Sequence, residues 1–121
     1  MLSANVTLDL LSRAVDVSAL RQSVYSANIA NAGVEGYRRM EVSFDSELER
    51  VALQMANAQH GTSPGAALPQ QSATVFATDD AVRLDEEMGL MAKNALRYQI
   101  LLGAFERTMG SLRTAVREGR E

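Results

Sequence analysis

Hydrophobic residues recur every seven positions along the last third of the chain. A first series is Met88, Ala95, Leu102, Met109 and Val116, and a second series, offset from it by three residues, is Met91, Tyr98, Phe105 and Leu112. These nine residues fill successive a and d positions of a heptad repeat, and none of them is charged. Because a sustained seven-residue repeat requires a helix to wrap around a neighbour, the pattern predicts a long C-terminal helix over residues 84–121 that packs against another helix.

Charged residues at the two ends of this segment also fit a helix. The acidic residues near its start are Asp79, Asp80, Asp85, Glu86 and Glu87, and the basic residues towards its end are Arg107, Arg113, Arg117 and Arg120. Acidic groups favour the positive end of the helix dipole and basic groups favour the negative end. We therefore expect the acidic cluster to be a solvated helix start, with Asp85 as its cap.

The first third of the chain predicts a second helix, over residues 1–32, with a less regular apolar stripe. The residues on that stripe are Leu10, Val17 and Val24, with Leu20 and Ala27 at the offset positions. We expect the helix to end near Asn31-Ala32-Gly33, since Asn and Gly tolerate the left-handed conformation that closes a helix. The apolar positions of both terminal segments are our candidates for the residues through which subunits assemble.

The middle region, residues 33–83, reads mainly as loop. Residues 41–44 alternate between polar and apolar, and residues 73–78 have strand character, so we expect these two stretches to pair. Residues 44–58 have the spacing of a short helix, capped by Asp45 or Ser46, and residues 59–71 have the composition of a loop. The predicted fold is mainly α, with the two long terminal helices paired as a coiled-coil-like bundle around a short irregular, β-containing middle region.

Composition narrows the possible classes of protein. A chain of 121 residues suits one domain, and with 5% aromatic residues and no Trp its core must be built from Leu, Val, Ala and Met. The net charge of -3 argues against a nucleic-acid binder. No apolar run approaches the ~20 residues that span a bilayer, and the N-terminus does not resemble a cleaved secretory signal.

Candidate catalytic chemistry is sparse. His60 is the single histidine and lies in the predicted loop, and the absence of Cys excludes thiolate metal sites and disulfides. The acidic cluster at the predicted helix start lacks the spacing of a calcium loop. The methionines of the heptad stripe are interpreted as packing residues rather than as a ligand groove. We therefore expect no enzymatic activity, no cofactor and no metal.

One segment resembles a known family. Residues 26–37 read S-A-N-I-A-N-A-G-V-E-G-Y and resemble the signature that closes the first helix in the flagellar rod and hook family. The matching residues are Asn28, Ile29, Ala30, Asn31, Gly36 and Tyr37. Val34-Glu35 stands where the family usually has Thr-Pro. We expect the Asn side chains to satisfy backbone groups at the helix end, Gly36 to adopt a positive φ, and Tyr37 to anchor its ring.

Three further stretches resemble the proximal-rod member of this family. They are residues 42–48, residues 82–88 and residues 94–99, the last of which contains Asn94, Leu96, Arg97, Tyr98 and Gln99. The resemblance covers both ends of the chain and leaves out only about residues 49–75. The short middle region also fits, because hook and distal rod proteins carry large insertions there.

The resemblance implies a structural subunit of the proximal rod of the bacterial flagellar basal body, which polymerises through its terminal helices into part of the torque-transmitting shaft. It implies export through the flagellar type III apparatus without a cleaved signal peptide, and assembly in the periplasm. The implied partners are other copies of the chain, other rod proteins, and the rod adaptor FliE and membrane ring at the rod base. Two alternatives stay open: another rod protein of the same family, or a cytoplasmic helical adaptor or chaperone that dimerises through its C-terminal coiled coil.

Overall fold

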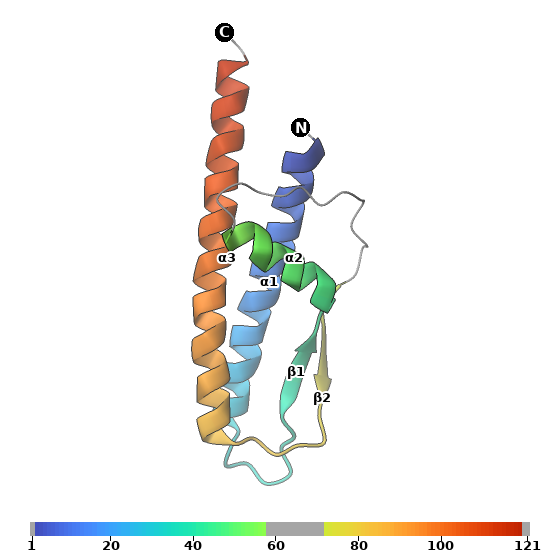
Figure 1. Cartoon of the computed structure of the whole chain (residues 1–121). Coiled ribbons are helices and arrows are strands. Elements are labelled where there is room, and N and C mark those ends of the chain that lie inside the picture. Colours follow the sequence, from blue (N-terminus) through green and yellow to red (C-terminus); the bar gives the residue numbers. More distant parts are fainter. Residues whose placement is uncertain (1, 58–71, 120–121) are drawn as a thin grey trace.

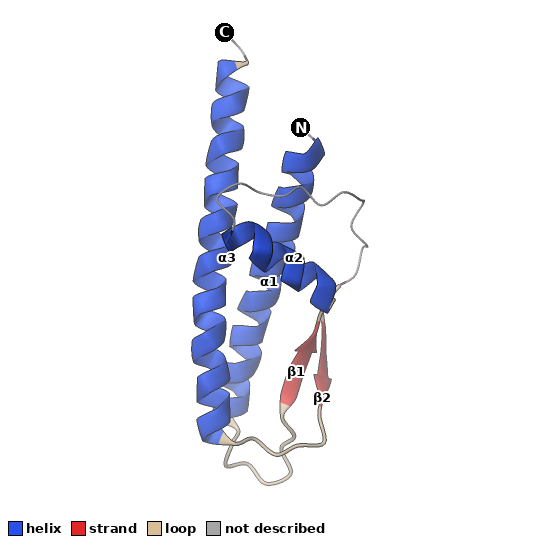
Figure 2. Ribbon diagram, in the orientation of Figure 1, coloured by secondary structure: helices blue, strands red, loops and turns tan. Residues whose placement is uncertain are grey.

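Two long antiparallel helices form the body of the molecule, and a short helix and two strands lie along one flank (Figures 1 and 2). The computed structural model describes residues 2–57 and 72–119. In chain order the elements are α1 (Leu2–Ala30), β1 (Met40–Ser43), α2 (Ser46–Asn57), β2 (Thr74–Ala77) and α3 (Leu84–Glu118). The predicted fold class, mainly α with a β-containing middle region, is confirmed.

The two strands pair antiparallel, with Met40 opposite Ala77 and Ser43 opposite Thr74. The ladder continues past β1, where the Thr78 N–H donates to the Arg39 carbonyl at 2.8 Å. The predicted pairing of these two stretches is confirmed. Because α2 lies between the strands in the sequence, they are not joined by a tight hairpin turn.

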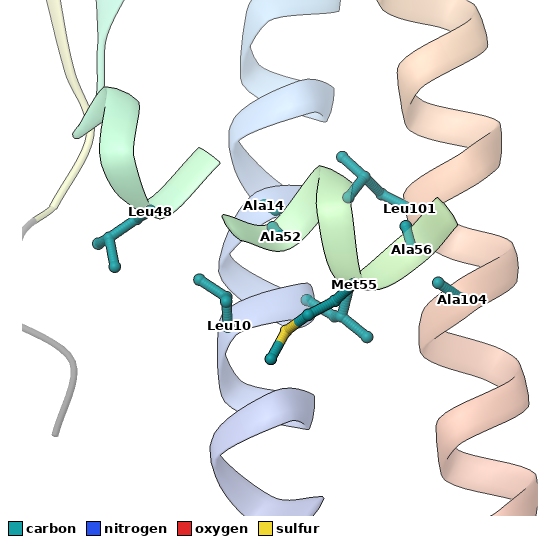
Figure 3. Close-up of a cluster of buried hydrophobic side chains, with 9 residues drawn as sticks. Leu10, Ala14, Leu48, Ala52, Met55, Ala56, Leu101 and Ala104 are labelled. Atoms are coloured by element: carbon teal, nitrogen blue, oxygen red, sulfur yellow. The ribbon is translucent and has the colours of Figure 1, made fainter. Parts of the chain in front are cut away.

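The main core lies where α2 crosses both long helices (Figure 3). Its buried residues are Leu10, Leu11 and Ala14 of α1, Leu48, Ala52, Met55 and Ala56 of α2, and Leu101 and Ala104 of α3. Three of the four alanines in this cluster are at most 3% exposed, and their small side chains let the helices approach closely. A second, smaller cluster joins Val17 and Val24 of α1 to Val42 of β1.

The starts of α2 and α3 differ in how they are capped. The Asp45 carboxylate accepts hydrogen bonds from the N–H groups of Glu47 at 2.9 Å and Leu48 at 3.3 Å. Of the two predicted candidates, Asp45 and Ser46, Asp45 is therefore the residue that caps α2. The cap position of α3 is Arg83, which makes no side-chain cap bond. The prediction that Asp85 caps this helix is wrong, because the chain leaves its extended conformation at Arg83 and Asp85 already lies inside the first turn.

The end of α1 is closed by an asparagine side chain. The Asn31 Nδ2 group donates to the Ala27 carbonyl at 2.7 Å, and the Asn31 N–H donates to the same oxygen at 3.0 Å. The helix ends where the sequence indicates, but the predicted left-handed residue at Asn31 or Gly33 is wrong, because these bonds satisfy the carbonyl without it. Among the described residues, the positive φ of +81° belongs to Gly36, as the resemblance implied.

Candidate assembly surface

The face of α3 that packs against α1 is displaced from its apolar stripe. The buried residues Glu87, Asn94 and Leu101 are spaced by seven, and each comes one residue before a stripe residue. One residue turns an α-helix by about 100°, so the series that begins at Met88 runs beside the α1 contact. The offset series lies nearer to that contact: Met91 accepts a hydrogen bond from Ser26 of α1, and Phe105 packs against the main core. Met88 and Val116 are 54% and 47% exposed, and the other seven stripe residues are half-buried. Most of the stripe therefore keeps surface available to another molecule.

The predicted assembly residues of α1 lie mostly inside the subunit. Leu10, Val17 and Val24 are buried in the two core clusters, and Leu20 is half-buried against the smaller one. Ala27 is exposed. The four leucine and valine residues thus stabilise the fold of one subunit, and their role between subunits stays a prediction.

A buried carboxylate joins the start of α3 to the rest of the molecule. Glu87 is 1% exposed, and Arg39 Nε donates to its two oxygens at 2.8 and 3.1 Å. Asn28 Nδ2 donates to Glu87 Oε1 at 2.8 Å. The expectation that Glu87 belongs to a solvated acidic cluster is wrong, because an arginine 48 positions away in the sequence neutralises it inside the structure. Asn28, Tyr37, Arg39 and Glu87 are called the polar cluster below.

Asn28 binds the backbone of β1 in the way a neighbouring strand does. Its Nδ2 donates to the Met40 carbonyl at 2.9 Å, and its Oδ1 accepts the Met40 N–H at 2.9 Å. The Tyr37 hydroxyl donates to the same Oδ1 at 3.0 Å, so the tyrosine is anchored as the resemblance implied. The expectation that Asn28 satisfies the end of α1 is wrong. This signature residue instead holds the returning chain against the helix.

The electrostatics of this region favour a permanent ion pair. Burial opposes the charge on Arg39, but its hydrogen bonds to Glu87 and Glu41 and their negative charges raise the pKa of Arg39 above its ordinary value. Burial also raises the pKa of the nearby Tyr25 phenol, against the lowering effect of Arg21 and Arg39. Both groups thus keep their protons at neutral pH. The arrangement supplies a structural link rather than an acid or base.

Asn94 provides a second polar contact between the long helices. It is 3% exposed, and its Nδ2 donates to the Ser18 carbonyl at 2.7 Å and to Gln22 Oε1 at 2.8 Å. Its Oδ1 has no hydrogen-bond partner within the described chain. A polar side chain at one helix-packing position is a known means of fixing register, since any shift leaves its hydrogen bonds unmade.

The rest of the 94–99 stretch divides between the two sides of α3. Arg97 reaches Glu49 of α2 at 3.7 Å, and Glu49 also pairs with Arg21 of α1, so three helices meet around one carboxylate. Tyr98 is half-buried, whereas Leu96, which is 62% exposed, and Gln99 face outward. The structure thus assigns internal contacts to Asn94 and Arg97 and leaves Leu96 and Gln99 at the surface.

Some of these contacts were not anticipated from the sequence. Arg21, Arg39 and Glu49 carried no motif that singled them out. The available signal was the seven-residue spacing of Glu87, Asn94 and Leu101, which places two polar residues in phase with a buried leucine.

The described parts of the chain, residues 2–57 and 72–119, hold no group of three acidic, His or Cys side chains arranged to bind a metal ion. Within the same ranges, none of the helices combines the length and the apolar character needed to cross a membrane. His60 and the predicted loop over residues 59–71 lie outside the described residues.

Comparison with known proteins identifies the class. Residues 1–38 match the family described as "Flagella basal body rod protein". The flagellar basal body rod protein FlgB of Escherichia coli K12 is 32% identical over 123 residues, which covers 88% of this chain and 89% of the relative. FlgB of one Cereibacter sphaeroides strain is 28% identical over 88% of this chain and 90% of its own length, and FlgB of Borrelia hermsii is 46% identical over 48 residues, 40% of this chain and 36% of that protein.

The protein is thus a component of the flagellar basal body rod. More specifically, the chain belongs to the FlgB family. The relatives are named as rod components and not as enzymes, in keeping with the structural contacts described above.

Proposed function

We propose that this chain polymerises through its terminal helices into the proximal rod and transmits torque as part of the shaft. The observation that carries the proposal is the apolar stripe of α3, which stays partly exposed in a single subunit and includes the exposed Met88 and Val116. Each large apolar side chain buried against a neighbour contributes about 1.5–3 kcal/mol, so several at one contact outweigh the entropy lost when subunits associate.

Torque transmission requires a subunit that does not deform internally. The polar cluster ties the end of α1, the strand β1 and the start of α3 to one another. Asn94 sets the register of the two long helices farther along. A slip by one turn would leave these buried groups without partners, at a cost of about 1–3 kcal/mol for each. These contacts support a rigid unit that passes force between its neighbours.

The proposal includes a route and a set of neighbours. We infer that the chain leaves the cytoplasm through the flagellar type III apparatus and assembles in the periplasm. A sequence without cysteine suits an oxidising compartment, where unpaired thiols form unwanted disulfides. Other copies, other rod proteins, the adaptor FliE and the membrane ring at the rod base are the proposed partners, on the strength of the family resemblance.

The decisive experiment compares two aspartate substitutions on α3 in a flagellated host that lacks its own copy of the protein. Leu102→Asp places a charge on the half-buried stripe, whereas Ile100→Asp makes the same kind of change at a 42% exposed site outside the stripe. We expect Leu102→Asp to abolish swimming and to remove the chain from purified basal bodies, and Ile100→Asp to retain both. Circular dichroism of both purified variants checks that they fold.

Absence of the unsubstituted chain from purified basal bodies would contradict the proposal. Equal loss of motility in the two folded variants would instead show that the stripe is not the contact surface. Sedimentation of the purified chain adds a separate check: a rod subunit gives monomers or open-ended polymers, whereas a discrete dimer favours the adaptor alternative.

A further inference from the structure

Two surfaces of the subunit complement each other but cannot meet within one molecule. The first is the end of α3, which extends beyond the first turn of α1 (Figure 1). Leu112, Arg113, Val116 and Arg117 lie on one side of this end and are called the tip below. Both arginines are exposed, and no ion pair within the described residues involves either of them. The tip therefore presents two apolar side chains beside two positive charges.

The second surface is a groove between α1 and the residues that follow β1 and precede β2. It has a volume of about 440 Å³, and its apolar lining is Val17, Leu20, Phe44 and Ala73. Asp9 and Asp16 lie at its margin with Arg13, to which the Asp9 carboxylate is joined at 2.9 Å. Asp9 and Asp16 are both exposed. The groove thus combines an apolar lining with a net negative rim.

We propose that the tip of one copy docks into the groove of the next copy, an inference that rests on the proposed assembly of this chain into a rod. Leu112 and Val116 would cover the apolar lining, and Arg113 and Arg117 would lie against the two aspartates. The charges are opposite in sign on the two surfaces, which favours this orientation and disfavours tip against tip. Because the two surfaces differ, the contact is heterologous and repeats in one direction instead of closing into a dimer.

The internal register of the subunit gives the stagger between neighbours. The core places residues 10–14 of α1 level with residues 101–104 of α3, and the tip lies about twelve residues farther along α3. The apolar lining at Val17 and Leu20 lies about six residues past the core level in the opposite direction, so at ~1.5 Å per residue the tip stands roughly 27 Å beyond it along the helix axis. Docking therefore requires parallel copies that are shifted by about this distance along their long axes, which is a polar arrangement suited to a shaft.

Cysteine crosslinking tests the contact in the assembled rod, because the natural chain has no cysteine to interfere. The reporter variant carries Leu20→Cys and Val116→Cys in the full chain, produced in flagellated cells that lack their own copy. Within one molecule these positions are about 30 Å apart along the axis, too far for a disulfide, which requires Cα atoms closer than ~7 Å. Oxidised basal bodies should give a ladder of multimers on non-reducing gels. A control with Glu47→Cys and Val116→Cys should give at least tenfold less crosslinked product, since Glu47 is exposed on α2 and does not line the groove.

Charge reversal in the reporter background tests the proposed recognition. Asp16→Arg alone and Arg113→Asp alone should each lower the crosslinked fraction about tenfold, and the two together should restore it to within about threefold. Basal bodies that contain the chain but show no preferential crosslink over the control would overturn the docking while leaving the rod proposal intact. Crosslinking of the tip to a different protein, in place of the ladder, would overturn it equally. Loss of the unsubstituted chain from basal bodies would contradict the rod proposal itself.

Discussion

Truncation of the buried carboxylate, Glu87→Ala, provides the sharpest test of how the subunit holds its shape. The substitution removes both oxygens that accept from Arg39 Nε and one acceptor of the Asn28 amide, and leaves Arg39 with Glu41 at 3.2 Å. Asn28 keeps its bonds to Met40, so the penalty centres on an arginine whose side chain is 14% exposed and now lacks its main partner. We expect the variant to fold with a looser joint between α1 and α3.

The structure sets the size of this effect. Removing one member of a buried ion pair costs about 3–5 kcal/mol, and the partial exposure of Arg39 places this case near 3 kcal/mol. A domain of this size is stable by only about 5–15 kcal/mol, so a large share of the total is lost. At roughly 4 °C per kcal/mol, the melting temperature should fall by about 10 °C.

Urea unfolding at neutral pH, followed by far-ultraviolet circular dichroism at low protein concentration, measures the change. Glu86→Ala is the matched control, because Glu86 precedes Glu87, is 60% exposed and makes a 3.5 Å contact with Arg83. We expect it to change the free energy of unfolding by under about 0.5 kcal/mol. The double variant Arg39→Met/Glu87→Leu removes both charges, and we expect it to be more stable than Glu87→Ala by about 2 kcal/mol.

The reasoning fails if Glu87→Ala and Glu86→Ala cost the same. It also fails if the double variant is less stable than Glu87→Ala, because the cost would then come from lost packing and not from an unpaired charge.

Two further predictions concern the returning chain and Tyr25, which lies near the polar cluster. Gly36→Val should lower the free energy of unfolding by about 1–2 kcal/mol, because Gly36 has a φ of +81° that a β-branched residue adopts only with strain. The control Gly33→Val, at a residue without a positive φ, should lower it far less, and urea unfolding of both variants measures the difference. Tyr25 has a raised pKa in the folded state, so the stability it contributes is complete below the unfolded value of about 10 and is lost as pH rises through the folded pKa. The free energy of unfolding should therefore fall as the pH rises above about 10, and Tyr25→Phe should flatten that fall; an identical slope in both proteins would contradict the assignment.

Much of the fold follows from hydrophobic periodicity. The two terminal helices, the short helix and the two extended stretches were predicted because each depends on spacing within about fifteen residues. The pairing of residues 41–44 with residues 73–78 was also predicted, although the two stretches lie far apart in the sequence. Local patterns fix local structure when one apolar face must be buried. The cap of α3 was misplaced because several acidic residues near its start are chemically equivalent, and only the backbone path selects Arg83.

The inward face of α3 was harder to predict. Counting apolar residues selects Met88, Ala95 and Leu102, whereas the structure buries Glu87, Asn94 and Leu101. A carboxylate and an amide are normally costly to bury, so a search based on hydrophobic periodicity assigns them to the solvent-exposed face of the helix. Their partners come from α1 and from the segment before β1, tens of residues away. Nothing within α3 itself indicates that those partners exist.

This division of residues has a consequence for how a subunit of a shaft can work. If the apolar stripe of α3 were buried against α1, the single molecule would satisfy its own hydrophobic surface, and little would drive it to associate. The structure instead uses the hydrogen bonds that Glu87 accepts and Asn94 donates to set the internal register, and it leaves much of the stripe partly uncovered. Directional polar bonds specify a geometry, whereas apolar area supplies affinity with little regard to orientation. A subunit built in this way is rigid before it meets its neighbours and still has a reason to bind them.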